Sequence, residues 1–222
     1  VWCWGLNSYG ELGTGTLASS PSPVPVQGLI SQVVSITAGF GHTCSVDALG
    51  ELSCWGRNYE GQLGNGTTMD ANLPGPITGL GATFSDVYAG GAHTCAKTTF
   101  GEIYCWGDNY YGSIGIGTSG AADATVSTPQ LVPSPAPGVT FTDVSLGSYN
   151  SCALASDGAT WCWGKTLVTG TSLQLAFDGA FPTQVPVASP ATGVWAGGEH
   201  ACAAAADGSL SCWGWNYNGD LG

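Results

Sequence analysis

The sequence has few charged residues, and almost none of them are basic. Lysine and arginine account for 3 of the 222 residues, against 15 aspartates and glutamates, which gives a formal net charge of −12. So few cations cannot neutralise a phosphate backbone or hold the protein on an anionic membrane. The composition therefore excludes nucleic acid and anionic membranes as partners, and it argues against phosphorylated ligands.

Long apolar runs and helical periodicity are also missing. No segment approaches the ~20 consecutive apolar residues of a transmembrane helix, and no basic-then-apolar leader precedes Val1. We therefore expect no membrane insertion. If the protein is secreted, its signal peptide has been removed or lies outside this chain.

The sequence is rich in glycine, with 36 residues, and it repeats the triplet Cys-Trp-Gly. The triplet recurs at intervals of 51, 51, 57 and 50 residues, starting at Cys3, Cys54, Cys105, Cys162 and Cys212. Each interval contains a proline-containing stretch, a β-rich run, two cysteines ten positions apart, and the triplet. This order predicts one tandem-repeat region over residues 1–222. The predicted units are 6–56, 57–107, 108–164 and 165–214, with partial units at 1–5 and 215–222.

Glycine-rich loops follow most of the triplets, such as NYEGQLGNGT after Gly56. The fourth copy, KTLVTGTSLQL, departs from this pattern and has Thr166 where the other copies have Asn. The longer third interval contains Ser, Thr, Ala and Pro residues around 119–138, which we expect to form a longer surface loop.

The segment HTCSVDALGELSCWG, residues 42–56, is typical of a β-hairpin. If Cys44 lies opposite Cys54, the inward pairs leave the three-residue loop 48–50, which ends in Gly50. Such a loop needs a left-handed residue at its third position, where glycine has no Cβ penalty. All four copies have glycine there.

This register places the two cysteines of each hairpin at a non-hydrogen-bonded pair, with Cα atoms about 4.5 Å apart and within disulfide reach. We therefore predict four disulfides, one in each hairpin. They join Cys44 to Cys54, Cys95 to Cys105, Cys152 to Cys162, and Cys202 to Cys212. The spacing is wrong for a zinc knuckle. Cys3 is left unpaired or available for an intermolecular bond.

Cysteine use and composition indicate an oxidising compartment. Nine cysteines, many glycines and only 8% charged residues are typical of an extracellular repeat protein rather than a cytosolic enzyme. We therefore expect the protein to be secreted or displayed at the cell surface.

Short strand-like runs bounded by Gly or Pro, repeated about every 51 residues, predict an all-β fold of propeller blades. About four blades are expected in this chain, as part of a larger propeller or an open array. The tryptophan of each triplet is predicted to pack between blades. A parallel β-solenoid is the alternative, but its period is normally shorter.

The phrase A-G-x-x-H-T-C, followed by D-G-x-L-x-C-W-G-x-N-x-x-G-x-L-G-x-G-T, resembles the repeat of the regulator of chromosome condensation family in its cysteine-containing bacterial extracellular form. The resemblance covers the whole chain. It implies a propeller, commonly of seven blades, that serves as a protein-binding platform. Family members include a nucleotide exchange factor for a small GTPase and a secreted β-lactamase inhibitor, so function does not follow from fold. The exchange-factor role fits less well, because disulfides and a base-poor surface suit neither nucleus nor chromatin.

No catalytic constellation is found, so we expect no enzyme activity, no cofactor and no metal. His42, His93 and His200 share one phase of the repeat, with Asn150 in the remaining copy. These side chains could suggest a metal ring, but a structural hydrogen-bonding role is the better interpretation. Asn65-Gly66-Thr67 matches a glycosylation sequon, which has meaning only in a glycosylating host.

Aromatic residues in the loops after the triplets are the candidate binding residues, because equivalent propeller loops gather on one rim. They are Tyr9, Tyr59, Tyr110, Tyr111, Trp215 and Tyr217. The predicted function is a secreted or surface interaction module that presents this rim to a protein or a glycan. The alternative is a structural subunit of an extracellular filament, which self-associates through open blade edges.

The two ends of the chain occupy the same phase of the repeat, since residues 2–13 correspond to residues 211–222. Ends that duplicate each other cannot close a ring by splitting one blade between them. We therefore expect that this chain is not a complete four-bladed ring.

Overall fold

The computed structural model describes residues 1–134, 136–166, 177–187 and 190–222, and these residues form an all-β protein. The strands are β1 (Trp2–Gly5), β2 (Ser20–Pro25), β3 (Val33–Ala38), β4 (His42–Asp47), β5 (Leu52–Gly56), β6 (Ala71–Ile77), β7 (Phe84–Ala89), β8 (His93–Thr98), β9 (Ile103–Asp108), β10 (Thr125–Leu131), β11 (Phe141–Leu146), β12 (Asn150–Ala155), β13 (Thr160–Thr166), β14 (Phe177–Val185), β15 (Ala191–Ala196), β16 (His200–Ala205) and β17 (Leu210–Gly214). A 3₁₀ turn, η1 (Ala121–Asp123), precedes β10.

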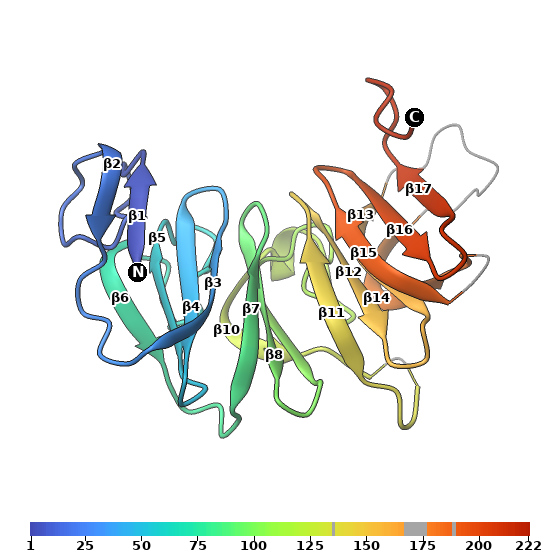
Figure 1. Ribbon diagram of the computed structural model, residues 1–222, viewed down its shortest axis with the longest axis horizontal. Coiled ribbons are helices and arrows are strands. Elements are labelled where there is room, and N and C mark those ends of the chain that lie inside the picture. The colour runs from blue at the N-terminus through green and yellow to red at the C-terminus, as the bar shows by residue number, and fades with distance from the viewer. Residues whose placement is uncertain (135, 167–176, 188–189) are drawn as a thin grey trace.

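The strands form five antiparallel sheets, which stand side by side in an arc (Figure 1). Three sheets have four strands in chain order: β3 to β6, β7 to β10 and β11 to β14. The sheet β15–β17 has three strands in the described residues, and β1 pairs with β2. The first strands are innermost, so that β3 packs on β7 and β11 packs on β15. The predicted propeller fold is confirmed, and antiparallel pairing rules out the parallel solenoid.

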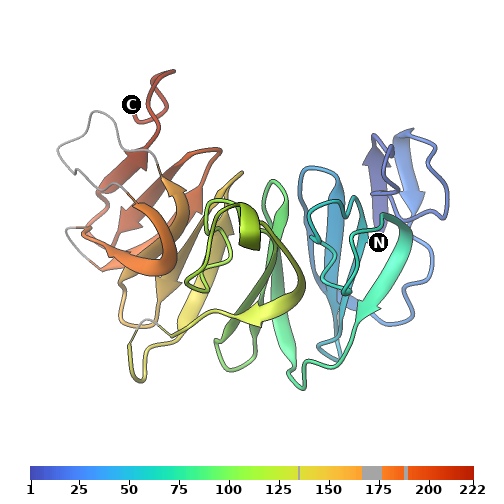
Figure 2. The same cartoon turned by 180° about the vertical axis from the view of Figure 1, so that it is seen from behind.

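The fourth strand of each four-stranded sheet lies on the outer side of the arc, where Figure 2 shows β6, β10 and β14. These strands contain prolines, such as Pro74 and Pro76 in β6. An edge strand tolerates proline because one row of its N–H groups has no partner to lose. Each sheet therefore ends one strand after the triplet, whereas the predicted units end at the triplet itself.

The prediction of one long surface loop around residues 119–138 is wrong. The structure places η1 and the edge strand β10 within this range, so the segment is not one long surface loop. The six additional residues of the third interval are split, with three before β10 and three between β10 and β11, relative to β6 and β7. Ser, Thr and Pro dominate β10, so its composition predicts a loop, although an outer edge strand accepts these residues. The expected departure of the fourth loop falls largely on residues 167–176, outside the described residues.

The hairpins have the predicted register. Cys44 lies opposite Cys54, with Val46 opposite Leu52, and the Asp47 N–H donates to the Glu51 carbonyl at 3.1 Å. The disulfide Cys44–Cys54 has a Cα–Cα distance of 4.1 Å, as do its three counterparts. The four bonds join the predicted pairs, and Cys3 is the free cysteine. The turn glycines 50, 101, 158 and 208 all have φ between 79° and 85°, as the three-residue loop requires.

At three of the boundaries, neighbouring sheets are joined by one backbone carbonyl. The carbonyl of Gln62, in the loop after β5, accepts hydrogen bonds from Trp106 Nε1 and from Thr94 Oγ1, both at 2.8 Å. The same pair of bonds occurs one repeat earlier and one repeat later. These bonds join Trp55 and Thr43 to Glu11, and Trp163 and Ser151 to Ser113. The tryptophans of the last four triplets, Trp55, Trp106, Trp163 and Trp213, are completely buried and pack between sheets as predicted, whereas Trp4 of the first triplet is 61% exposed.

The repeated histidines add a second bond across two of the same boundaries. His42 Nε2 lies 2.9 Å from Thr94 Oγ1, and His93 Nε2 lies 2.9 Å from Ser151 Oγ. Because Thr94 donates its only proton to the Gln62 carbonyl, it accepts from His42, and Nε2 therefore carries the histidine proton. Burial lowers the pKa of His42 to about 3, and the nearby charges of His93 and Arg57 contribute. Burial also lowers the pKa of His93 to about 4.

We expect the substitution Gly101→Val to destabilise the protein much more than Thr99→Ala in the same hairpin turn. A β-branched residue resists the left-handed conformation, and its Cβ would lie 2.8 Å from Thr140 Cβ in the next sheet. The expected loss is about 1–3 kcal/mol from backbone strain alone. Thr99 is exposed, so its replacement should cost little. Equal midpoints in urea unfolding would show that the turn assignment is wrong.

We also expect acidification from pH 7 to pH 5 to destabilise the fold. The unfolded chain binds protons at its histidines below their ordinary pKa of about 6.5, whereas the two buried histidines stay neutral when folded. Stability is therefore fully present above that pH and is lost as the pH falls towards 4. The loss should reach about 2 kcal/mol per buried histidine at pH 5.

The matched variant for this prediction is His42→Asn with His93→Asn, because Asn150 occupies the same position in the third full sheet and is buried there. Urea unfolding at the two pH values should show most of the pH dependence removed. The control is His200→Asn, since His200 is only half-buried. An unchanged pH dependence in the double variant would contradict the assignment.

Candidate functional site

The loops after the triplets lie on one face of the arc, which we call the loop face. The hairpin turns lie on the opposite face, which we call the turn face. In Figure 1 the turns between β4 and β5 and between β8 and β9 point down, and the C-terminal loop points up. After the last four triplets, a backbone bond joins the start of the loop to the turn that precedes the second strand of the same sheet, as in Lys165 N–H to the Tyr149 carbonyl at 2.9 Å. The loop face is therefore built from two kinds of segment.

An asparagine, buried in the first three copies and partly buried in the last, organises the loops that follow β1, β5, β9 and β17. Asn58 Oδ1 accepts the Leu63 N–H at 2.9 Å, and its Nδ2 donates to the carbonyls of Thr67 and Met69, both at 3.0 Å. Asn7 and Asn109 bond in the same way, and Asn216 Oδ1 accepts the Leu221 N–H. One side chain thus satisfies several loop backbone groups. Sequence reasoning noted this asparagine but missed its role, which its fixed position in four copies could have indicated.

The predicted aromatic residues all belong to the loop face, but their exposure differs. Tyr59, Tyr110 and Tyr217 are 75%, 49% and 84% exposed, and their rings are free to meet a partner. Tyr9 is also exposed, whereas Tyr111 and Trp215 are half-buried. The structure does not gather all six into one cluster.

One aromatic cluster surrounds Lys165, at the boundary of the second and third full sheets. Lys165 Nζ lies 4.9 Å from the ring centre of Tyr111 and 5.4 Å from that of Tyr149. The two rings are in edge-to-face contact, and Tyr111 makes a similar contact with Tyr110. Lys165 also donates to Glu199 Oε1 at 2.7 Å, and this hydrogen bond raises the pKa of the lysine. Four elements that are distant in sequence thus meet here.

A second cluster has the same composition two boundaries earlier, between the β1–β2 sheet and the sheet β3–β6. The Arg57 guanidinium lies 5.8 Å from the ring centre of Tyr9 and donates to Glu60 Oε1 at 2.6 Å. Both clusters therefore combine a cation, an aromatic ring and a carboxylate. Sequence analysis missed Arg57, Tyr149, Lys165 and Glu199. In the folded protein, the residue after the triplet glycine bonds to the turn that precedes the repeated histidine. Applied to the sequence, this pairing could have found these residues.

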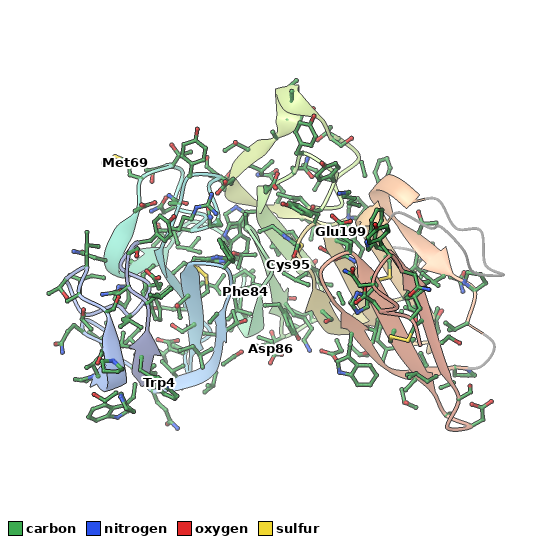
Figure 3. All side chains as sticks on the ribbon, turned by 90° about the horizontal axis from the view of Figure 1, so that it is seen from above. Trp4, Met69, Phe84, Asp86, Cys95 and Glu199 are labelled. Atoms are coloured by element: carbon green, nitrogen blue, oxygen red, sulfur yellow. A yellow bond between two sulfur atoms is a disulfide. The ribbon has the colours of Figure 1, made fainter. Side chains whose placement is uncertain are left out.

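Two hollows lie beside these clusters. One has a volume of about 470 Å³ and is lined by Tyr9, Arg57, Tyr59, Met69 and Asp70, among others. The other, of about 480 Å³, is lined by residues that include Glu199, His200, Trp215 and Asp220. Figure 3 views the molecule from this side, with Met69 and Glu199 marking the two places. The loop face thus offers aromatic rings beside concave, partly acidic surfaces.

The described residues contain no group of three or more His, Cys, Asp or Glu side chains placed to hold a metal ion. His42 and His93 are buried and hydrogen-bonded to neighbouring sheets, which fits the structural interpretation of this repeat position. Among the same residues, no helix is long and apolar enough to cross a membrane.

Comparison with known proteins identifies the repeat. The family pattern described as the regulator of chromosome condensation (RCC1) repeat matches residues 1–46, 50–96 and 101–154. A second pattern of the same description matches residues 33–62, 84–113 and 194–220. The chain is 32% identical over 169 residues to the ultraviolet-B receptor UVR8 of Arabidopsis thaliana, and 34% identical over 173 residues to the human E3 ubiquitin-protein ligase HERC2. Each match takes in 74% of this chain, but only 37% of the receptor and 4% of the ligase.

Solved structures share the fold at lower identity. Human WBSCR16 superposes on the whole chain with a TM-score of 0.84 and 24% identity, and 58% of that protein is covered. Prp20p from Saccharomyces cerevisiae superposes on 96% of the chain with a TM-score of 0.76 and 21% identity, over 51% of its own length. The sequence matches, which extend over more than half of the chain, show that it belongs to the regulator of chromosome condensation (RCC1) repeat family.

Proposed function

We propose that this protein is a non-catalytic interaction module that binds a protein partner through its loop face. The observation that carries the proposal is the set of exposed tyrosines held on loops that buried asparagines fix in place. Large rings on a preorganised surface lose little conformational entropy on binding and supply most of the energy in protein interfaces. The rings lie on successive sheets, so they suit a partner that covers several blades.

Relatives of this fold support a protein partner. A yeast member, Prp20, has been crystallised with Kap60, and Prp20p has been studied for its binding to Gsp1p and histones. RCC1-like repeat propellers are in general protein-interaction modules. We assign no ligase chemistry to this chain, because the match to HERC2 covers only 4% of that enzyme.

The proposed setting is an oxidising, extracellular one. Four disulfides within hairpins support it, three of them buried, since such bonds persist where thiols are not kept reduced. A glycan remains the alternative ligand for the exposed rings. Self-association, the alternative role expected from the sequence, would use the end surfaces of the arc instead of the loop face.

The loop face can be tested with matched pairs of variants. Tyr59→Ser with Tyr110→Ser removes one exposed ring from each of two adjacent sheets on the loop face. Leu49→Ser with Phe100→Ser removes one exposed apolar side chain from each of the same two sheets on the turn face. We expect the first pair to lower partner retention by about tenfold or more. The control pair should retain the partner fully, and both should leave the melting temperature nearly unchanged.

The measurement is capture from the extracellular fraction of the source organism on immobilised wild-type and variant protein, followed by quantitative mass spectrometry. A glycan array with the same proteins distinguishes a carbohydrate ligand. If no protein is retained differently by the two pairs of variants, the loop face is not the binding surface.

A further inference from the structure

The loop between β5 and β6 contains an asparagine followed directly by glycine, Asn65-Gly66. Both residues are exposed, as is Thr67 after them. Gly66 has no Cβ, so no side chain shields the approach of its backbone nitrogen to the side-chain amide of Asn65. A nucleophile and an electrophilic carbon are therefore neighbours in the chain, and water reaches both.

The side-chain oxygen of Asn65 accepts hydrogen bonds from its own loop. Oδ1 lies 2.8 Å from the Thr67 hydroxyl oxygen and 3.1 Å from the Thr67 nitrogen, and Asn58 Nδ2 donates to it at 3.4 Å. Asn58 is completely buried, so its donor is held in place. Donors arranged around a carbonyl oxygen stabilise the negative charge that develops on it when a nucleophile adds to the carbon.

The internal repeat shows that the fold does not require an amide at this position. Thr14 and Ile116 occupy it in the loops after β1 and β9. The glycine that follows donates its N–H to the outer strand of the next sheet in all three loops, and here Gly66 bonds to the Ser127 carbonyl at 2.8 Å. Asn65 thus adds a reactive group to a contact that the other loops make without it.

We propose that Asn65 is a self-modification site, at which the backbone nitrogen of Gly66 displaces ammonia from the side chain. The nitrogen gives its proton to hydroxide and bonds to Asn65 Cγ. The bond from Cγ to Nδ2 breaks, and ammonia leaves with that electron pair and a proton from water. The product is a succinimide ring. Water then opens the ring at either carbonyl and leaves aspartate or isoaspartate at position 65, so the net reaction consumes water and releases ammonia.

The reaction competes with the contact between the loop and the next sheet. The Gly66 N–H must leave the Ser127 carbonyl before its nitrogen attacks, so conversion requires local opening of this bond. Isoaspartate lengthens the backbone before Gly66, which prevents the bond from forming again in the same geometry. Both products also add a negative charge to the loop face. Conversion therefore frees the loop that carries Tyr59 from the neighbouring sheet.

The test is incubation of the purified protein at mildly alkaline pH, followed by peptide mapping that separates aspartate from isoaspartate. Asn218-Gly219 is the internal control, because Asp220 stands where Thr67 follows the first pair and offers no hydroxyl donor. We expect Asn65 to convert about tenfold faster than Asn218, since hydrogen bonds to a charged oxygen are the strong ones. Isoaspartate identifies the ring, because direct hydrolysis of the amide gives aspartate alone.

Matched variants separate the proposed chemistry from simple exposure of the loop. Thr67→Val should slow conversion about tenfold, whereas Thr67→Ser keeps the hydroxyl and should keep the rate. Asn65→Thr should give no product and leave hydrogen exchange at the Gly66 amide unchanged, because the loop with Thr14 makes the same backbone bond. Wild-type protein that has converted should show faster exchange at Gly66.

Persistence of Asn65 while Asn218 converts would overturn the proposal, as would a Thr67→Val rate equal to or above that of the wild type. Unchanged exchange at Gly66 after conversion would overturn the release of the loop. A glycan on Asn65 in material from the source organism would also overturn the proposal, because a glycosylated Nδ2 does not leave as ammonia.

Discussion

One backbone carbonyl at each of three sheet boundaries joins neighbouring sheets of the arc. The carbonyls of Glu11, Gln62 and Ser113 each accept a tryptophan N–H and a hydroxyl from the following sheet. A carbonyl has two lone pairs, so this buried group is fully satisfied, and it fixes the position of two side chains at once. The loop that carries it must be short and closely packed. Gly64 is required beneath the indole of Trp106, since a Cβ there would lie 2.7 Å from Nε1. The glycine pattern, the buried asparagine and the tryptophan are thus parts of one contact.

The parts of the structure that follow from local spacing could be predicted from the sequence. The hairpin register, the disulfides and the positive φ of Gly50 depend on fifteen neighbouring residues, and short-range geometry decides them. The inter-sheet bonds could not be predicted in the same way. Their acceptor is a main-chain atom with no side-chain signature, and Trp106 lies 44 residues from Gln62. The strand β10 was missed because an outer edge requires so little of its residues that its composition is that of a loop.

In the candidate site, too, only the features that depend on neighbouring residues could be predicted from the sequence. Its tyrosines stand out as aromatic residues among glycines, so sequence analysis found them. Lys165, Tyr149 and Glu199 come from three strands or turns, and only the folded arrangement brings them together. The sequence also explains why these cations matter. In the described residues, each of Arg57, Lys97 and Lys165 forms a salt bridge, so the basic groups act within the protein and not as free positive charges on its surface.

The histidine–hydroxyl bonds give the array a direction. Each passes from the histidine of one sheet to the hydroxyl residue of the next, never the reverse, because the hydroxyl proton is committed to the loop carbonyl. A sheet therefore has two chemically different sides, one that donates through imidazole and one that receives through threonine or serine. Two like sides cannot reproduce this contact, so a two-fold symmetric pairing of sheets is excluded for it. Any extension of the array through this contact must be head-to-tail.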